Sequence, residues 1–458
     1  MKKKILLLSD DLRMTSGVAN MSKELVLGTV DKYDWVQLAA AIKHPEYGKI
    51  IDLNDDVRKT TGVEDANVRL YPTNGYGDIN RLRELISAEK PDAILHFTDP
   101  HYWQWLYDNE HEIRQQVPIM FYHIWDDLPD PHYNKDYYES CDWIGCISKQ
   151  TYGIVHRVGK TSKFSTQTPL KDWQISYVPH GVSSETYKPL ETIDPKVEKF
   201  IKGDKDYEFI LFFNNRNIKR KQPSDVIYSY KLFCDSLPKE KSEKCLLLMH
   251  TTAIDQNGTD LIAVSEALCP DYDIKFTNEK FSQEQLNQFY NLIDCTINIS
   301  NNEGFGLSTA ESLMAGTPII VNVTGGLQDQ CGFKNGKSLV SEKDYIKIGS
   351  LHDQRLWEDK VTHGEWVNPV WSSSITLNGS IGTPYIFDDR INHYDVVKSI
   401  HSMWDMGREE RKRVGLLGRE YMINNFSTQV MCESLSNGID KCLKTYKRKK
   451  PFELYKIV

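Results

Sequence analysis

The segment Ser300–Glu311 (Ser-Asn-Asn-Glu-Gly-Phe-Gly-Leu-Ser-Thr-Ala-Glu) combines acidic side chains and glycines where an apolar strand gives way to a helix. The strand ends near Ser300, and the helix begins at about Leu307–Ser308. A helix N-terminus offers free N–H groups and partial positive charge, and Gly304 and Gly306 let the backbone approach an anion closely. The segment therefore predicts a phosphate-binding turn beyond the carboxyl end of a strand, where open α/β sheets bind ligands.

Two glutamates accompany this turn, Glu303 within it and Glu311 about one helical turn further on. Carboxylates repel phosphate, so their expected partners are hydroxyl groups of a sugar or a ribose, which donate hydrogen bonds. If the segment stood alone, two solvated glutamates around a helix start would explain the same pattern.

A second group of polar residues, Asn214–Lys221, follows the predicted strand Phe209–Phe213. Arg216 and Lys221 are five positions apart in it. Fixed cations stabilise the charge that a diphosphate gains when it leaves a sugar. A solvated basic loop is the alternative.

The two segments together resemble the donor site of the retaining GT-B glycosyltransferases of the GT4 type (the glycosyltransferase group 1 family). The E-x7-E pattern of that family is matched by Glu303 and Glu311. The residues from Glu311 to Pro318 continue the family's helix motif, and Gly325-Gly326 matches the pair after the next strand. The resemblance is strong from Ile210 to Gly326.

The resemblance implies a role for each matching residue. Glu303 would bind hydroxyls of the transferred sugar, Glu311 would hold the ribose, and Arg216 and Lys221 would stabilise the leaving diphosphate. The sugar and the diphosphate would face the backbone of Gly304, Phe305, Gly306 and Leu307. The family has glycines where this chain has Asn215 and Gln222.

The N-terminal half is similar to the same family at two places. Thr15–Leu25 resembles the glycine-containing loop that opens the first helix, and Gly17 would then lie near the donor diphosphate or the acceptor. Phe121–Asp126 resembles the strand that ends in an active-site histidine, so His123 would touch the transferred sugar. A simple turn and a buried, hydrogen-bonded histidine are the alternatives.

Short apolar runs alternate with amphipathic stretches, which favours parallel sheets covered by helices. We expect an α/β protein of the GT-B class, with two Rossmann-like, doubly wound domains facing a cleft. The expected domains are residues 1–190 on the acceptor side and 205–440 on the donor side. Residues 331–384 break the alternation and are read as an insert of loop character, and a helix at 440–458 is expected to cross back to the first domain.

The composition excludes several classes of protein. The 458 residues include 56 Lys+Arg and 64 Asp+Glu, a net charge of −8, unlike a globally basic nucleic-acid binder. The apolar run near the start is only Ile5–Leu8, too short for a secretory signal, so we expect a cytoplasmic protein. The nine scattered cysteines include no C-x-x-C and predict reduced, mostly buried thiols.

Three other groups of residues could bind something. Asp10-Asp11 and Asp126-Asp127 could attract a metal, but they lack the D-x-D spacing, and the family resemblance implies no metal ligand. His96, His101 and His111 lie among aromatic residues, without the spacing of zinc ligands. Lys441–Lys450 is read either as a solvated helix end or as a contact for an anionic membrane or nucleic acid.

The sequence thus predicts a retaining glycosyltransferase that uses a nucleotide sugar and no permanently bound cofactor. A UDP-sugar is favoured, although the base is open. The acceptor is equally open: a glycan, a lipid, a protein or a hydroxymethylated DNA base, the last as in a bacteriophage DNA-modifying enzyme. A nucleotide-sugar epimerase and a catalytically silent sugar-nucleotide-binding scaffold are the alternatives of other classes.

Overall fold

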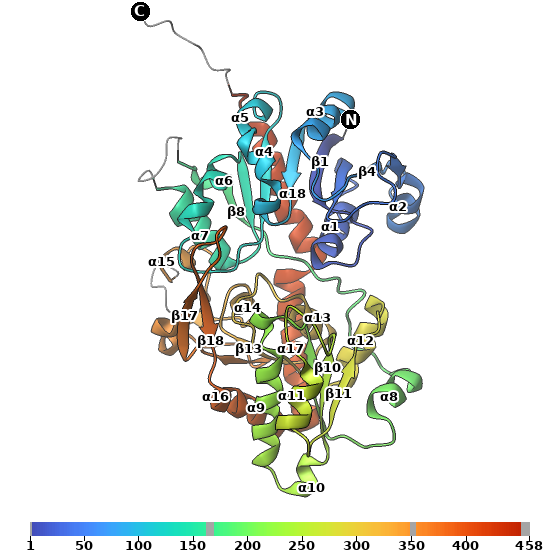
Figure 1. The fold of residues 1–458 in the computed structure, drawn as a ribbon, viewed down its shortest axis with the longest axis vertical. Helices are drawn as coiled ribbons and strands as arrows, with labels where there is room; N and C mark the ends of the chain where they lie inside the picture. Colours follow the sequence, from blue (N-terminus) through green and yellow to red (C-terminus); the bar gives the residue numbers. More distant parts are fainter. Residues whose placement is uncertain (1, 162–168, 349–353, 450–458) are drawn as a thin grey trace, which may run out of the picture. The chain divides into compact units, whose positions relative to one another are not determined.

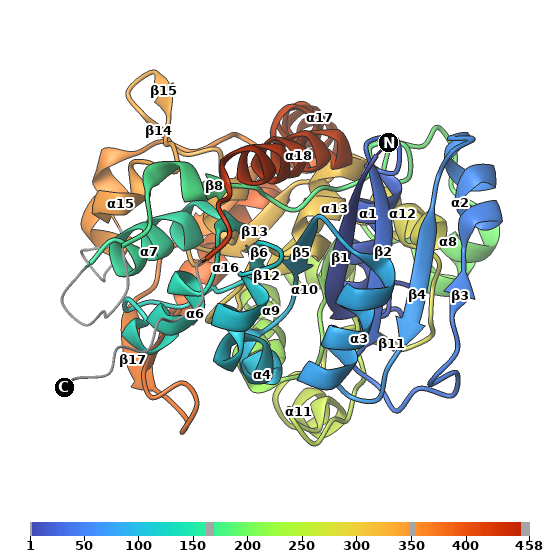
Figure 2. The ribbon, with the colours of Figure 1, turned by 90° about the horizontal axis from the view of Figure 1, so that it is seen from above.

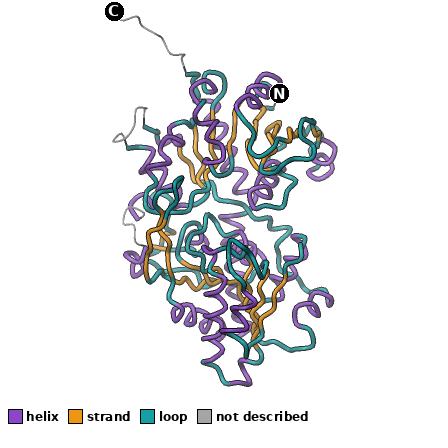
Figure 3. The backbone as a smooth tube through the Cα atoms, in the orientation of Figure 1, coloured by secondary structure: helices purple, strands orange, loops and turns teal. Residues whose placement is uncertain are grey.

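The computed structural model describes residues 2–161, 169–348 and 354–449, which form two compact α/β units. The first unit comprises the chain up to Trp125, Asp130–Gly181 and the chain from Thr428 onward. The second comprises Asp126–Pro129 and Val182–Ser427. In each unit, helices and loops surround a central sheet (Figures 1 and 3).

The first unit is built on an eight-stranded sheet that is parallel except for one edge strand. In spatial order its strands are β3 (Ile51–Asp52), β4 (Val68–Pro72), β2 (Tyr33–Ala40), β1 (Lys3–Asp10), β5 (Ala93–His96), β6 (Ile119–His123), β7 (Trp143–Cys146) and β8 (Ile175–Tyr177). Figure 2 shows β4, β2 and β1 side by side. Ile5 of β1 lies opposite Trp35 of β2, and both are buried, as the near-continuous apolar runs of these strands predict.

The first unit also contains helices and short helical turns. They are α1 (Gly17–Leu27), α2 (Asn54–Thr61), α3 (Ile79–Glu89), η1 (Pro100–Trp103), α4 (Gln104–Asp108), α5 (Glu110–Ile113), η2 (His132–Asn134), α6 (Lys135–Glu139), α7 (Lys149–Gly159), η3 (Asp172–Gln174) and α18 (Thr428–Thr445). Ser16 caps α1 by accepting a hydrogen bond of 3.1 Å from the Ala19 N–H, a typical helix start.

The last helix, α18, returns the chain to the first unit and packs against β7 and α1. Close packing depends on Gly438, where a Cβ atom would lie 2.1 Å from the Trp143 ring. The crossing predicted for 440–458 therefore begins earlier, at Thr428. Residues 450–458 of the predicted segment lie outside the described residues.

The second unit has a six-stranded sheet in which every pair of neighbouring strands is parallel. Its spatial order is β11 (Ile274–Thr277), β10 (Cys245–His250), β9 (Phe209–Asn214), β12 (Cys295–Asn298), β13 (Ile319–Asn322) and β16 (Val367–Val370). The strand order reverses between β9 and β12, which creates a ligand-binding position at the carboxyl ends of these two strands.

The helices of the second unit include a long C-terminal pair. In chain order the helical elements are α8 (Pro195–Lys202), η4 (Lys219–Lys221), α9 (Pro223–Asp235), α10 (Lys239–Ser242), α11 (Leu261–Leu268), α12 (Gln283–Leu292), α13 (Leu307–Ala315), α14 (Leu327–Gln330), α15 (Tyr345–Ile348), η6 (Gln354–Lys360), α16 (His393–Asp405) and α17 (Gly407–Phe426). The core beneath them includes Phe209, Phe233 and Met403.

The insert predicted at 331–384 contains regular structure, which corrects the expectation of a loop. It holds two small strands, β14 (Lys334–Asn335) and β15 (Ser338–Leu339), and the sixth strand of the sheet, β16. A hairpin of β17 (Ser374–Asn378) and β18 (Ile386–Arg390) follows. Pro369 is tolerated in β16 because this is an edge strand.

Three whole-chain expectations can be compared with the described residues. All nine cysteines are buried and form no disulfide, as predicted. Within residues 2–161, 169–348 and 354–449, no helix has the length and apolarity needed to span a membrane. The same ranges contain no cluster of three or more His, Cys, Asp or Glu side chains placed to hold a metal ion.

Candidate active site

The carboxyl ends of β9 and β12 carry the polar groups that the sequence singled out in the second unit. Asn298 ends β12, and Glu303 lies in the turn between β12 and α13. Lys221 ends the short turn η4, which follows β9. The strand-order reversal therefore brings the two predicted segments together at one edge of the sheet.

Glu303 and Lys221 form a buried ion pair, with side-chain exposures of 12% and 8%. The Asn298 amide also donates to Glu303 Oε2, at 3.4 Å. Burial alone would raise the pKa of Glu303, but the charges of Lys221 and Arg220 outweigh it and lower the pKa below its ordinary value. Glu303 is therefore an ionised acceptor, as an interaction with hydroxyl groups requires.

Arg220, which is not among the residues predicted for the donor site, lies beside this pair. Its guanidinium donates to the Asn302 carbonyl at 2.6 Å and lies 3.8 Å from the Asp126 carboxylate. Asp126 begins a short segment, up to Pro129, that belongs to the second unit. Burial raises the pKa of Asp126, and the positive charge of Arg220 opposes that rise.

The start of α13 is shaped by glycines. Gly306 precedes the helix with φ +86°, a conformation that favours glycine, and no side chain caps the helix. A Cβ atom on Gly326 would lie 2.1 Å from the Gly304 carbonyl oxygen, and the Gly326 N–H donates to the Glu303 carbonyl at 2.8 Å. The Gly325-Gly326 pair thus packs directly on the backbone of the predicted phosphate turn.

The remaining residues of this turn differ in what they can offer a ligand. Phe305 is buried with its ring 5.7 Å from that of Phe426, so its side chain belongs to the core. Gly304 and Leu307 are partly exposed. The expected contact of this backbone with a sugar or a diphosphate stays a prediction.

Glu311 lies on α13 and accepts a hydrogen bond of 2.8 Å from the Tyr290 hydroxyl. Burial raises its pKa to about 7, although the hydroxyls of Tyr290 and Tyr187 oppose that rise. Tyr290 in turn receives a hydrogen bond from the Asn214 amide, which ends β9. Glu311 is thus positioned from a different helix, α12, and is linked to the end of the central strand.

Arg216, predicted to act with Lys221, is exposed. Among the residues that the structure describes, none forms an ion pair or a hydrogen bond with its guanidinium. Lys221 is joined to Glu303 instead, and the cation next to this pair is Arg220. The expected role of Arg216 stays a prediction.

The candidates of the first unit lie at the carboxyl ends of its own strands. Gly17 begins α1 after β1, and His123 ends β6. His123 is fully buried, and its Nε2 lies 2.9 Å from the Tyr138 hydroxyl. Burial lowers its pKa to about 3, so the ring is neutral near pH 7. A contact with a sugar stays a prediction for both residues.

Sequence reasoning missed Tyr290 and Asn298 as partners of the two glutamates. Tyr290 lies on α12, and its contact with Glu311 depends on which face of that helix meets α13, which a sequence pattern does not indicate. Asn298 is a buried polar residue at the end of an apolar strand, and that position was an available signal.

Known proteins resemble this chain in sequence over part of its length and in fold over nearly all of it. Residues 195–348 match the family model Glycosyl transferases group 1. No curated protein sequence matches the chain.

Solved structures resemble nearly the whole chain. A glycosyltransferase of Rickettsia africae ESF-5 has a TM-score of 0.63 at 14% identity, over 97% of this chain and 99% of that one. Sucrose-phosphate synthase of Thermosynechococcus elongatus has a TM-score of 0.65 at 13% identity, over 97% and 100%. Anabaena HepE in complex with UDP has a TM-score of 0.61 at 11% identity, over 96% and 100%.

These similarities confirm the expected α/β fold of the GT-B class, with two Rossmann-like units. The expected cleft between the units stays a prediction. The family match includes Lys221, Glu303 and Glu311, which the structure gathers at the strand-order reversal. The segment 195–348 is thus similar to the group 1 glycosyl transferases, and nearly the whole chain shares the fold of the solved structures.

Proposed function

We propose that this protein transfers a glycosyl group from a nucleotide sugar to an acceptor hydroxyl, with retention at the anomeric carbon. The observation that carries the proposal is the buried Lys221–Glu303 pair beside the uncapped start of α13. It combines an ionised hydroxyl acceptor, a cation and free backbone N–H groups at one edge of a sheet. A sugar diphosphate needs these three kinds of group.

Glu303 and Glu311 have separate roles in this proposal. Glu303 is ionised and accepts hydrogen bonds from hydroxyls of the transferred sugar. Glu311, held by Tyr290, accepts hydrogen bonds from the ribose. Because its pKa is about 7 in the free protein, ribose hydroxyls that donate to it favour its ionised form.

The cations act on the leaving group. As the bond between sugar and phosphate breaks, negative charge grows on the diphosphate, and a fixed cation stabilises it. Lys221 and Arg220 are already placed at this edge, and the exposed Arg216 is proposed to join them when a diphosphate is bound. In the retaining mechanism, an oxygen of the leaving diphosphate helps to remove the acceptor proton, and no carboxylate acts as nucleophile.

Known complexes support a UDP-sugar as the donor. Among the similar structures, HepE is in complex with UDP, and the trehalose-6-phosphate structure from E. coli is bound with UDP-2-fluoro glucose. We propose a uridine nucleotide for this chain on that basis. The acceptor is open, and Gly17 and His123 are proposed to face it or the transferred sugar from the first unit.

The first experiment measures thermal shifts with UDP, GDP, ADP, CDP and their sugar conjugates. A ligand at about 100 times its Kd stabilises the native protein by about 2.7 kcal/mol. We expect UDP to shift the wild type and to lose its effect on Glu311→Gln. The variant Glu303→Gln should keep the shift with UDP but lose the additional shift given by the sugar. Glu409→Gln, an exposed glutamate of the same unit, is the matched control.

Absence of a shift with every nucleotide in the folded wild type would contradict the donor site. So would equal shifts in the wild type and Glu311→Gln. Turnover then separates the alternatives: an epimerase converts the donor without an acceptor, whereas a transferase needs one. Retention is checked by NMR, from the anomeric configuration of donor and product.

A further inference from the structure

The first unit has an open pocket of about 830 Å³ that none of the proposed transfer chemistry uses. Lys3 of its lining belongs to the start of β1, Asp92 directly precedes β5, and Val117 lies just before β6. The pocket therefore lies at the amino ends of these parallel strands. Gly17 and His123 lie at the opposite, carboxyl ends, where α/β sheets bind their substrates.

Positive charge dominates the lining, although the whole chain carries a net charge of −8. It contains four cations, Lys3, Lys90, Lys444 and Arg448, against two carboxylates. Both carboxylates are engaged. Asp92 forms an ion pair of 2.8 Å with Lys3, and Asp440 accepts a hydrogen bond of 2.7 Å from the Tyr33 hydroxyl.

The other three cations have no such partner. Among the described residues, none forms an ion pair with the side chain of Lys90, Lys444 or Arg448. They come from the end of α3 and from α18 with the segment that follows it, and they converge on one pocket. Three unpaired cations around one pocket create a positive electrostatic potential that attracts an anion.

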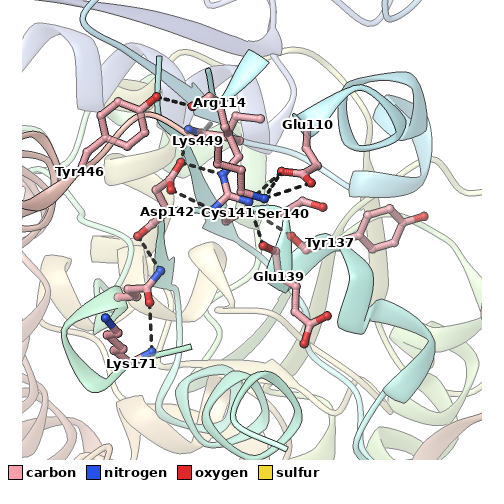
Figure 4. A network of polar contacts seen from close by, with 12 residues as sticks. Glu110, Arg114, Tyr137, Glu139, Ser140, Cys141, Asp142, Lys171, Tyr446 and Lys449 are labelled. Atoms are coloured by element: carbon pink, nitrogen blue, oxygen red, sulfur yellow. Dashed lines mark hydrogen bonds and ion pairs between the residues drawn. The ribbon is translucent and has the colours of Figure 1, made fainter. Parts of the chain in front are cut away.

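The segment that carries Arg448 is held firmly on both sides, as Figure 4 shows. The Tyr446 hydroxyl and the Lys449 N–H both donate to the Arg114 carbonyl, at 2.5 Å and 3.0 Å. Lys449 Nζ also forms an ion pair of 3.0 Å with Glu110. The pocket wall after α18 is therefore built by specific contacts that fix the backbone on either side of Arg448.

The network behind this wall is itself buried and paired. Arg114 donates to Asp142 at 2.9 Å and to Glu110 at 2.7 Å. The side chains of all three are 9% to 13% exposed. Because Arg114 is held by two carboxylates, its carbonyl provides a fixed anchor for Tyr446 and Lys449.

The lining also has an apolar part. Ile86 and Val117 are buried, and Leu443 and Tyr446 are partly buried beside the basic residues. Pockets of 300–1,000 Å³ that combine apolar walls with a few charged groups suit small organic ligands. A flat basic surface for a nucleic-acid duplex would need no such apolar wall.

We propose that this pocket binds a small organic phosphate. Its phosphate group would contact Lys90, Lys444 and Arg448, because arginine binds phosphate through two parallel N–H groups and lysine adds a point charge. Its apolar or planar body would pack against Leu443 and Tyr446. The ligand is either a soluble phosphorylated metabolite or the headgroup of an anionic phospholipid, since both present the same chemistry.

The test compares two double variants with the same change of charge. Lys444→Glu with Arg448→Glu alters the pocket, and Lys441→Glu with Lys447→Glu alters exposed neighbours outside the lining. Calorimetric titration uses phenyl phosphate as the soluble probe, with inorganic phosphate for comparison. Sedimentation uses phosphatidylcholine vesicles with and without phosphatidylglycerol.

We expect saturable binding in one of the two measurements. Binding in the calorimetric titration indicates a soluble phosphate, and binding in the vesicle sedimentation indicates a phospholipid headgroup. The pocket variant should lose affinity by about tenfold or more, whereas the control variant keeps wild-type affinity within about twofold. Equal losses in both variants would overturn the proposal in favour of a general basic surface, such as one for nucleic acid. Absence of saturable binding to the wild type in both arms would also overturn it. The proposal rests on the first unit alone, so it stands or falls separately from the transfer reaction.

Discussion

Two pairs of neighbouring strand ends, one pair in each sheet, carry different kinds of polar chemistry. In the second unit, the ends of β9 and β12 hold the buried ion pair of Lys221 and Glu303, with Arg220 beside it. In the first unit, β5 and β6 end in His96 and His123, which are buried, neutral and bound to tyrosine hydroxyls. The ends of β9 and β12 are thus charged and those of β5 and β6 are neutral and aromatic, although β1 of the first sheet is followed by an ion pair of Asp11 with Arg13.

The buried ion pair of the second unit carries a free-energy penalty that the neutral pairs of the first unit avoid. Burying an ion pair removes two charges from water, and well-packed apolar residues often serve stability equally well. Neutral histidine–tyrosine pairs avoid this penalty because each bond joins uncharged partners. The charged edge of the second unit is therefore better explained by ligand chemistry than by stability, whereas the edge of the first unit is compatible with either.

The largest expected effect comes from breaking the charged pair on one side only. Lys221→Met leaves Glu303 buried without its cation, and removing one partner of a buried pair costs about 3–5 kcal/mol. Urea unfolding of the variant and the wild type measures this loss. In the double variant with Glu303→Gln, most of the stability should return while donor binding stays lost.

A loss below about 1 kcal/mol for Lys221→Met would show that Glu303 is solvated or protonated and that the buried charged edge does not exist in solution. Lys412→Met, an exposed lysine on α17, controls for the removal of a positive charge alone.

The corresponding experiment in the first unit should give a smaller effect. His123→Phe keeps a ring of similar size but leaves the Tyr138 hydroxyl without its 2.9 Å partner, a loss of about 1–3 kcal/mol. Adding Tyr138→Phe removes the orphaned hydroxyl and should recover part of that loss. Urea unfolding at pH 7 is the measurement. A loss as large as that of Lys221→Met would erase the distinction between the two edges.

Much of the fold follows from the sequence, because buried parallel strands are near-continuous apolar runs. The prediction Phe209–Phe213 differs from β9 by one residue. Two strands of the same sheet escape the pattern for visible reasons. β11 (Ile274–Thr277) is mostly half-buried and contains a lysine, and β16 contains Asn368 and Pro369 at the sheet edge. Edge strands lack the apolar signal on which the prediction depends.

The sequence predicts the parts of the candidate site that lie within one continuous segment. Gly306 needs positive φ, and Glu303 and Glu311 lie in the same turn-and-helix segment, so these residues can be recognised together. The contacts of Lys221 with Glu303 and of Tyr290 with Glu311 depend on how separate elements pack. Packing register across a sheet and between helices is a tertiary property that local patterns do not encode.

The last expected effect, the smallest for a single unit of pH, distinguishes Glu311 from His123 by the direction in which they titrate. Burial raises the pKa of Glu311 from 4.5 to about 7, so the native state binds an extra proton between these values. Stability should therefore fall as pH rises from 4.5 to 7, by at most about 1.4 kcal/mol per pH unit. Burial lowers the pKa of His123 from 6.5 to about 3, so its contribution rises with pH over that range.

Unfolding free energies measured from pH 4 to 8 separate the two contributions. Glu311→Gln keeps an acceptor for the Tyr290 hydroxyl but cannot titrate, so it should gain stability relative to the wild type as pH rises towards 7. His123→Phe should lose its disadvantage as pH falls below 6.5, because the wild type alone must then resist protonation. Glu409→Gln, which is exposed, should parallel the wild type throughout. If the unfolding free energy of Glu311→Gln also parallels that of the wild type, Glu311 titrates with its ordinary pKa. Its carboxylate would then already be ionised near pH 7 before the ribose binds.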